Sequence, residues 1–373
     1  MIPFLDLASQ QAEIVDEVLP GWRAAFEAAA FIGGPEVSAF EQEFAAYLGV
    51  RHVVGVSNGT DALELAYRAA GVQAGDEVVM PANTFIATAE AASRIGAVPV
   101  FVDVDPDHLL IDPSAIEAVI SARTRAIVPV HLYGQTAPMA EVLAVARAHG
   151  VAVVEDAAQA QGATSTAGTA GALGRLAGTS FYPGKNLGAA GDAGAVMCND
   201  DDLAAVVRSM AAHGSAVKYV HERVGMNARL DALQAPVLRA KLRRLEGWNA
   251  ARRTAADRYQ ELLSSVEGVV LPAVRPGNRD VWHLYVIQVE NRDLVMQAMT
   301  SSGIGVAIHY PTPVPLSPAY AHLGYRSGQF PVSEAAAGRI LSLPMFPHLT
   351  ASQQERVATG LADAVAQSWP TSK

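Results

Sequence analysis

The segment Val151-Ala152-Val153-Val154-Glu155-Asp156 joins four apolar residues to two acids. An apolar run without polar alternation is typical of a strand that is buried on both faces of a parallel sheet. In open α/β sheets, ligands bind at the carboxyl ends of the strands. The segment therefore predicts that Asp156 lies at a binding edge. The alternative is that Asp156 only caps the helix that follows the strand.

Similar apolar segments flank this strand, and stretches rich in helix-forming residues separate them. Strands that alternate with helices at this spacing indicate βαβ units and a mostly parallel sheet. We expect further strands at residues 52–56, 77–80, 98–102, 126–130, 179–182 and 194–197. We expect helices at residues 13–30 and 36–48, from about Asp61 and Ala87, at 230–263, and from about Ala351.

The character of the sequence changes past about Asn227, where a long helical stretch begins at Leu230. Beyond it lie the apolar segment 281–287 and a proline-broken segment at 309–315. We therefore expect a large domain over residues 1–245, with a mixed, mostly parallel sheet flanked by helices. A smaller C-terminal α/β domain is expected over residues 246–373.

Composition excludes several classes of protein. Half of the 373 residues are hydrophobic and the net charge is −10, which suits a large core and argues against a nucleic-acid surface. No stretch approaches the roughly 18 apolar residues of a membrane span. A single cysteine, Cys198, and an N-terminus unlike a signal peptide fit a soluble, cytoplasmic protein. The ten histidines show no metal-ligand spacing, so no metal is expected.

Lys185 follows a Pro-Gly bend in the stretch Thr179-Ser180-Phe181-Tyr182-Pro183-Gly184-Lys185-Asn186-Leu187-Gly188. A lysine that forms a Schiff base must be held, desolvated and closely approached by a ligand. The alternative for this residue alone is an ordinary exposed lysine after a turn. Together with the carboxylate of Asp156, it favours pyridoxal phosphate, whose pyridine nitrogen an acid keeps protonated while a lysine anchors the aldehyde.

Ser57-Asn58-Gly59-Thr60-Asp61-Ala62-Leu63 follows the first expected strand and opens a helix. The unpaired N–H groups and the dipole of a helix N-terminus favour a phosphate, and Gly59 permits close approach. The same residues are also a good turn with an N-cap. Residues 178–185 have the wrong spacing for a P-loop, because one residue is too many and Asn186 replaces the required Ser or Thr.

Taken together, these motifs resemble those of the nucleotide-sugar aminotransferases called the DegT/StrS family, which are fold-type I pyridoxal phosphate enzymes. The resemblance extends from Ile2 to Phe346. It is carried by the motifs at residues 57–63, Pro81-Ala82-Asn83-Thr84-Phe85, Glu155-Asp156-Ala157-Ala158-Gln159, 180–186 and Gly225-Met226-Asn227-Ala228-Arg229-Leu230-Asp231.

The resemblance implies a role for each matched residue around the cofactor ring. Lys185 would bind the aldehyde covalently, and Asp156 would pair with the pyridinium. Gln159 would hydrogen-bond the ring hydroxyl, and Phe85 would stack on the ring face. Taken singly, Phe85 could belong to the core and Gln159 to a helix surface.

The resemblance also implies a phosphate site shared between two subunits. Gly59 and Thr60 would supply backbone amides and Ser180 its hydroxyl. Asn227 would reach the phosphate from the partner subunit, so a homodimer is expected; alone, Asn227 could be a turn residue.

The implied reaction is a transamination in which L-glutamate gives its amino group to a keto sugar carried on a nucleotide. The form of the lysine motif resembles the branch that aminates C3 of dTDP-linked 3-keto-6-deoxyhexoses. In that branch the sugar or diphosphate would be met by Tyr182, Lys218, Tyr219, His309 and Tyr310. The segment Val314-Pro315-Leu316-Ser317 departs from the usual family pattern near the sugar.

Several alternatives share the same cofactor residues. The ketone could be a 4-keto nucleotide sugar, a UDP-linked 3-keto uronic acid or a ketocyclitol. A dehydratase of this family has a histidine in place of the lysine, so Lys185 argues against it. A non-catalytic regulator that binds the cofactor is a further alternative of a different class.

Overall fold

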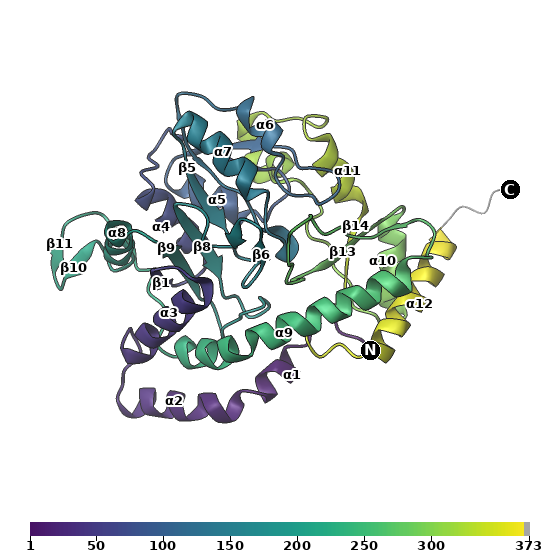
Figure 1. Cartoon of the computed structure of the whole chain (residues 1–373), viewed down its shortest axis with the longest axis horizontal. Helices are drawn as coiled ribbons and strands as arrows, with labels where there is room; N and C mark the ends of the chain where they lie inside the picture. The colour runs from purple at the N-terminus through teal and green to yellow at the C-terminus, as the bar shows by residue number, and fades with distance from the viewer. Residues whose placement is uncertain (369–373) are drawn as a thin grey trace.

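A seven-stranded sheet forms the centre of the computed structural model, which describes residues 1–368 (Figure 1). Its strands are β1 (His52–Val56), β2 (Glu77–Pro81), β3 (Val98–Val102), β4 (Thr124–Ile127), β5 (Ala152–Asp156), β8 (Leu176–Ser180) and β9 (Gly194–Cys198). The strand order is β1-β9-β8-β5-β4-β2-β3. Only β9 runs antiparallel to its neighbours, β1 and β8. The prediction of a mixed, mostly parallel sheet is confirmed.

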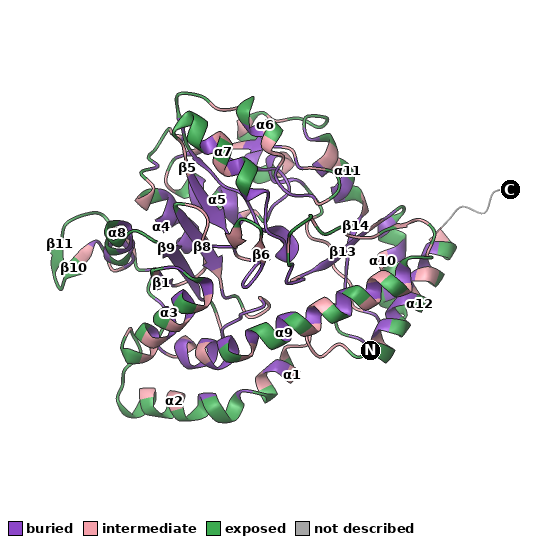
Figure 2. Cartoon of the chain, in the orientation of Figure 1, coloured by how far each residue is buried: buried purple, intermediate pink, exposed green. Residues whose placement is uncertain are grey.

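Helices cover both faces of this sheet because successive side chains of each strand point to opposite faces. In β5, Val153 packs into one hydrophobic cluster and Val154 into another. The face of Val154 is covered by α4 (Gly59–Ala69), α5 (Ala87–Arg94) and α8 (Asp201–Ala211). The opposite face is covered by α3 (Pro35–Leu48), α6 (Pro113–Glu117), α7 (Met139–His149) and α9 (Gln234–Leu263). Figure 2 shows the buried strands between these partly exposed helices.

Two strands differ from their predicted positions. The strand predicted at 179–182 is β8, which begins earlier, at Leu176. Its Gly178 weakens the apolar pattern, yet glycine is needed there because a Cβ would lie 2.9 Å from the side chain of Leu63. The strand predicted at 126–130 ends at Ile127, and Val130 forms only an isolated bridge with Asp156.

The helix predicted at 13–30 corresponds to α2 (Val15–Glu27), which is shorter at both ends. A short helix that the sequence did not predict, α1 (Leu7–Ala12), precedes it. Asp6 caps α1 by accepting a hydrogen bond from the backbone N–H of Ser9. Between the two helices, Ile14 packs in a cluster with Trp248 of α9.

The long helix α9 begins at Gln234, four residues later than predicted. Asp231 forms a bridge with Ile32, and the N–H of Ala232 donates to the carbonyl of Phe31. Because these backbone groups pair with another segment, they cannot belong to a helix. The predicted domain boundary at 245/246 falls within α9, and its position stays a prediction.

A three-stranded antiparallel sheet follows α9, with its own core. It consists of β12 (Val269–Val270), β13 (Tyr285–Val289) and β14 (Ile340–Leu343), packed with α10 (Arg292–Ser301), α11 (Pro331–Arg339) and α12 (Ala351–Ser368). The predicted helix from about Ala351 is confirmed. The remaining elements are short: β6 (Thr164–Ser165), β7 (Gly168–Thr169), β10 (Ser215–Val217), β11 (Val220–His221), η1 (Leu132–Gly134), η2 (Val314–Leu316) and η3 (Pro318–Leu323). Within residues 1–368, no helix is long and apolar enough to cross a membrane.

Candidate active site

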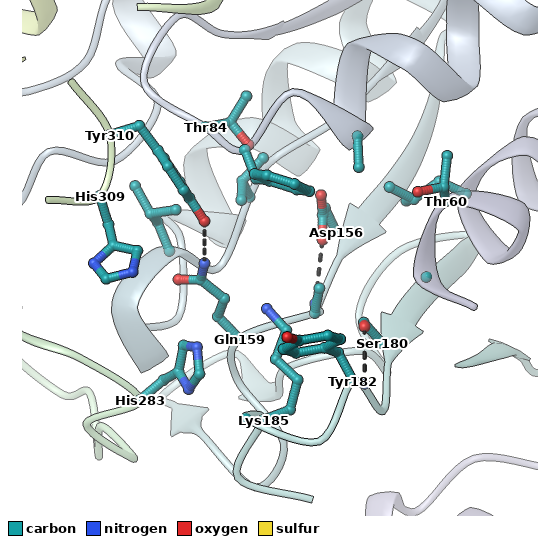
Figure 3. A pocket seen from close by; sticks show the side chains of 18 of the residues that line it. Thr60, Thr84, Asp156, Gln159, Ser180, Tyr182, Lys185, His283, His309 and Tyr310 are labelled. Atoms are coloured by element: carbon teal, nitrogen blue, oxygen red, sulfur yellow. Dashed lines mark hydrogen bonds between the residues drawn. The ribbon is translucent and has the colours of Figure 1, made fainter. Parts of the chain in front are cut away.

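A cavity of about 1030 Å³ opens at the carboxyl ends of β5 and β8 and at the start of α4 (Figure 3). Its lining comes from segments that are far apart in the chain, from Phe4 to Met345. Most of the residues that the sequence singled out meet here: Gly59, Thr60, Phe85, Asp156, Gln159, Ser180, Tyr182, Lys185, His309 and Tyr310.

Asp156 is the last residue of β5 and is buried. Its Oδ2 accepts a hydrogen bond of 2.7 Å from the hydroxyl of Thr88, and its Oδ1 accepts one of 3.1 Å from the N–H of Ala158. The hydroxyl of Thr84 lies 2.8 Å from that of Thr88 and must donate to it, because the proton of Thr88 is already used. The carboxylate is therefore held in one orientation at the edge of the cavity.

Lys185 is presented by a tight turn in which its own N–H donates to the carbonyl of Tyr182. Burial lowers the pKa of the Lys185 amine to about 8, although the nearby charge of Asp156 acts in the opposite direction. A neutral fraction of the amine is therefore present near physiological pH. Only a neutral amine can attack a carbonyl, so this lysine is suited to forming a Schiff base.

The start of α4 provides an anion site next to the end of β8. Asn58 caps the helix, since its Oδ1 accepts from the N–H of Asp61. Gly59 lies so close to the strand that a Cβ there would be 2.6 Å from the Cβ of Ser180. The first-turn N–H groups of a helix point at such a site and favour a phosphate.

A hydrogen-bonded group of side chains fixes the opposite wall of the cavity. Gln159 accepts from the N–H of Tyr133 at 2.7 Å and donates through Nε2 to the hydroxyl of Tyr310 at 3.1 Å. The hydroxyl of Tyr133 donates to the carbonyl of His309. Phe85 is 51% exposed, and its ring centroid lies 5.4 Å from that of Tyr310. A large aromatic face left open towards the cavity can stack on a planar ligand.

His309 lies in the same wall, where its ring stacks on Phe4 at a centroid distance of 5.6 Å. Its Nδ1 is 2.8 Å from the hydroxyl of Ser342. Burial, and then the charge of Lys185, lower the pKa of His309 to about 4. The imidazole is therefore neutral at physiological pH and is suited to a hydrogen bond with an uncharged sugar hydroxyl.

Three of the predicted residues lie away from this cavity. Lys218 and Tyr219 form the turn of the exposed β10–β11 hairpin, which projects beside α8 in Figure 1. The amine of Lys218 lies 5.0 Å from the ring centroid of Tyr219. Asn227 is also exposed and accepts a hydrogen bond from Arg229. Within one protomer, these three residues do not join the other site residues.

The structure adds residues that the sequence did not single out. Thr88 orients Asp156, Tyr133 orients Gln159, and the ring of His283 lines the cavity near Lys185. None of the three belongs to a quoted motif, and only their long-range contacts reveal them. Arg94 also lines the cavity, but ion pairs with Asp61 and Glu64 already occupy it.

These residues fit pyridoxal phosphate on structural grounds. A buried carboxylate faces a lysine of lowered pKa, an open aromatic face lies beside them, and a glycine-opened helix end supplies an anion site. Among residues 1–368, no group of three or more His, Cys, Asp and Glu side chains could hold a metal ion.

The fold and this site define a pyridoxal phosphate-dependent aminotransferase. The model of the DegT/DnrJ/EryC1/StrS aminotransferase family matches residues 12–362, and the chain belongs to that family. The expected cofactor and fold class are thereby confirmed.

Three relatives and one solved structure show how similar this chain is to known proteins. The "erythromycin biosynthesis sensory transduction protein EryC1" of Saccharopolyspora erythraea is 49% identical over 96% of this chain and 98% of its own length. The dTDP-3-amino-3,4,6-trideoxy-α-D-glucose transaminase of Streptomyces venezuelae is 44% identical over 95% and 94%. A UDP-N-acetyl-3-dehydro-α-D-glucosamine 3-aminotransferase of Acidithiobacillus ferrooxidans is 45% identical over 96% of both chains. The crystal structure of S. venezuelae DesV in complex with a ketimine intermediate has 43% identity and a TM-score of 0.95, and covers 97% of this chain and 98% of that chain.

Proposed function

We propose that this sugar aminotransferase transfers the amino group of L-glutamate to C3 of a dTDP-linked 3-keto-6-deoxyhexose. The observation that carries the proposal is the cavity that holds Lys185 and Asp156 together in a chain similar to dTDP-3-amino-sugar transaminases. A volume of about 1030 Å³ is at the upper end of small-molecule sites, which suits a cofactor together with a sugar nucleotide.

The cofactor ring is assigned to four side chains. Pyridoxal phosphate, when bound, supplies an aldehyde carbon that carries the amino group and a ring that withdraws electrons. Asp156 would keep the ring nitrogen protonated through its negative charge, and Thr88 holds that carboxylate at the cavity edge. Gln159 has one amide hydrogen left for the ring hydroxyl after its bond to Tyr310. Phe85 would cover one face of the ring, and Lys185 would anchor the aldehyde.

The phosphate is assigned to the start of α4. The amides of Gly59 and Thr60 would donate to it, and Ser180 would add its hydroxyl from the adjacent end of β8. Positive charge at a helix N-terminus stabilises an anion there.

Lys185 has a second task once it is released from the cofactor. Its amine would move a proton between the carbon of the amino acid or sugar and the aldehyde-derived carbon of the cofactor. A pKa of about 8 makes both directions possible near neutral pH, because neither the amine nor the ammonium is strongly disfavoured. His309, Tyr310 and Tyr182 would hold the sugar, since all three line the cavity beside this lysine.

We propose that the active unit is a homodimer in which each protomer completes the other's site. Lys218, Tyr219 and Asn227 lie outside their own protomer's cavity and are exposed. Tyr219 is 81% and Val224 is 92% exposed, which is unusual for large apolar groups on one short segment. A partner surface would cover them and bring Lys218 to a substrate diphosphate and Asn227 to the cofactor phosphate.

The single cysteine also suits a reducing cytoplasm.

A panel of ketones tests the substrate. Purified enzyme with L-glutamate would be offered dTDP-linked 3-keto and 4-keto hexoses, a UDP-linked 3-keto sugar and a ketocyclitol, and amino-sugar formation would be measured. We expect the dTDP-3-keto sugar to give the highest kcat/KM. A higher value for the UDP-linked sugar, on which the relative of A. ferrooxidans acts by name, would overturn the choice of nucleotide.

A regulator without catalysis is the second candidate, favoured by the name of the S. erythraea relative, a "sensory transduction protein". L-glutamate alone separates the two, because only an aminotransferase uses it to convert the bound cofactor. We expect glutamate to bleach the absorbance of the lysine-bound cofactor. An unchanged spectrum would favour the regulator.

A further inference from the structure

Two buried amide side chains lie behind the cavity, and backbone carbonyls fix their orientation. Asn186 follows Lys185 directly, and Asn249 lies on α9. The Nδ2 of Asn249 is 3.0 Å from the carbonyl of Gln161, and the Nδ2 of Asn186 is 2.9 Å from the carbonyl of Val281. A carbonyl oxygen can only accept, so the amide nitrogens must face these carbonyls. The Nδ2 of Asn186 also donates to Asn249 Oδ1 at 2.9 Å, which agrees with this orientation.

This orientation determines which nitrogen of His283 carries hydrogen. Asn186 Oδ1 faces His283 Nδ1 at 3.1 Å, and an amide oxygen cannot donate. The hydrogen must therefore be on Nδ1, which leaves Nε2 of the neutral ring with a free lone pair. Within residues 1–368, Nε2 has no hydrogen-bond partner. Figure 3 shows the His283 ring beside Lys185, at the same side of the cavity.

His283 stays neutral in this setting. Burial lowers the pKa of His283 well below its usual value, and the positive charges of Lys185 and Arg252 lower it further. Burial and the nearby charges thus disfavour protonation of the ring, and Asn186 disfavours the tautomer that carries its hydrogen on Nε2. His283 is consequently a permanent hydrogen-bond acceptor that faces the cavity.

We propose that His283 is a positioning residue for Lys185: when the ε-amine is released from the cofactor and turns towards the imidazole, Nε2 accepts one of its hydrogens. The proposal rests on the function assigned above to Lys185. Asp156 attracts the same amine from the opposite side. An acceptor at His283 holds the free amine away from that carboxylate and leaves its lone pair directed at the reacting carbon atoms.

The proposal fixes the sign of a measurable change. Lys185 faces Asp156 on β5, and the imidazoles of His283 and His309. A neutral acceptor binds an ammonium more strongly than an amine, so it raises the pKa of the lysine. Removing the acceptor should therefore lower the pKa of Lys185, whereas removing a positively charged histidine would raise it.

Cofactor-free protein gives the first test. The pH dependence of Lys185 acetylation would be followed by peptide mass spectrometry in wild type, His283→Phe and His283→Gln. We expect the midpoint to fall by roughly half to one pH unit in His283→Phe. His283→Gln retains an acceptor oxygen and should stay close to wild type. An unchanged or raised midpoint in His283→Phe would overturn the proposal.

The exposed His149 at the end of α7 provides the matched control, since His149→Phe should leave the midpoint unchanged. Thermal unfolding of each variant shows whether it is folded.

The second test measures the wild-type protein itself. In wild-type protein labelled with ¹⁵N-histidine, we expect the His283 signals to show a protonated Nδ1 and an unprotonated Nε2 from about pH 6 to about pH 9. His283→Gln identifies the signals by their loss. The Nε2–H tautomer or an imidazolium would contradict the proposal. Neither test uses turnover, so a failure of the assigned reaction would leave both results interpretable.

Discussion

Gly59, at the start of α4, lies against Ser180, at the end of β8, more closely than any other residue type would allow. A Cβ at position 59 would be 2.6 Å from the Cβ of Ser180 and 3.2 Å from its hydroxyl oxygen. Carbon atoms do not approach this closely without a shift of the backbone or the side chain. The contact therefore sets the position of the helix end relative to the strand end, and with it the geometry of the proposed phosphate site.

We predict that Gly59→Ala weakens pyridoxal phosphate binding by roughly 10- to 100-fold, a loss of about 1.4 to 2.8 kcal/mol. The added methyl group must push α4 away from Ser180 and spoil the alignment of the first-turn amides. Equilibrium titration of the cofactor by absorbance measures the effect. Gly247→Ala is the control, because a Cβ on this exposed residue of α9 meets nothing within 4 Å. Wild-type affinity in Gly59→Ala would place the phosphate elsewhere.

Replacing Lys185 tests the covalent anchor. Lys185→Ala should lose the absorbance band of the lysine-bound cofactor and all turnover, while its thermal unfolding stays close to that of wild type. The fold should persist because truncating a side chain that lines a cavity leaves the hydrophobic clusters intact. Borohydride reduction followed by peptide mapping is the measurement. Fixation of the cofactor to a different lysine would refute the assignment.

Removing the carboxylate of Asp156 should lower the reaction rate more than removing its hydroxyl donor, Thr88. Asp156→Ala should retain some cofactor but lose nearly all rate, because a neutral pyridine ring is a poor electron sink. Thr88→Val keeps the charge and removes one hydrogen bond. We expect a roughly tenfold lower rate, because a hydrogen bond to a charged group contributes about 1.5 kcal/mol. Stopped-flow kinetics of the glutamate half-reaction gives both rates. Equal rates in Thr88→Val and Asp156→Ala would contradict this order.

Hybrid dimers test whether the site is shared. Lys185→Ala inactivates its own site, and Asn227→Asp should repel the phosphate in the partner's site. Mixed after unfolding and refolding, the two inactive variants should recover roughly a quarter of wild-type activity, because half of the random dimers contain one intact site of two. Each variant refolded alone is the control. No recovery in the mixture would refute a site that is built from two protomers.

The buried histidines make stability depend on pH. The pKa of His309 is lowered to about 4 in the folded protein, from an ordinary value near 6.5. Between these values the unfolded chain binds more protons, so folding loses stability as the pH falls from about 6.5 towards 4. Urea unfolding of cofactor-free protein at several pH values should show a smaller loss for His309→Gln than for wild type. An equal loss in both would show that His309 is not buried in its neutral form.

The sheet could be predicted because its signal is local. Apolar runs such as His52–Val56 and Val98–Val102 coincide with β1 and β3. The late start of α9 could not, because it depends on the bridge between Asp231 and Ile32, which are far apart in the chain. Periodicity carries no information about such partners.

The site shows the same division. Asp156 and Lys185 could be found from the sequence because a strand end and a Pro-Gly turn precede them. Thr88 and Tyr133 could not, since their relevance lies in hydrogen bonds to Asp156 and Gln159 across the fold. His283 stands in an apolar segment that indicates only a strand. Its tautomer follows from two amides that only the folded structure brings to it.

The lining of the cavity runs from Phe4 to Met345, which has a consequence for biogenesis. A ribosome-bound chain lacks part of the pocket wall until Met345 has emerged. Loading with pyridoxal phosphate must therefore wait until that residue has been synthesised and folded. A ligand that binds only finished molecules stabilises them selectively, so cells short of vitamin B6 should accumulate less of this protein through faster degradation of the empty form.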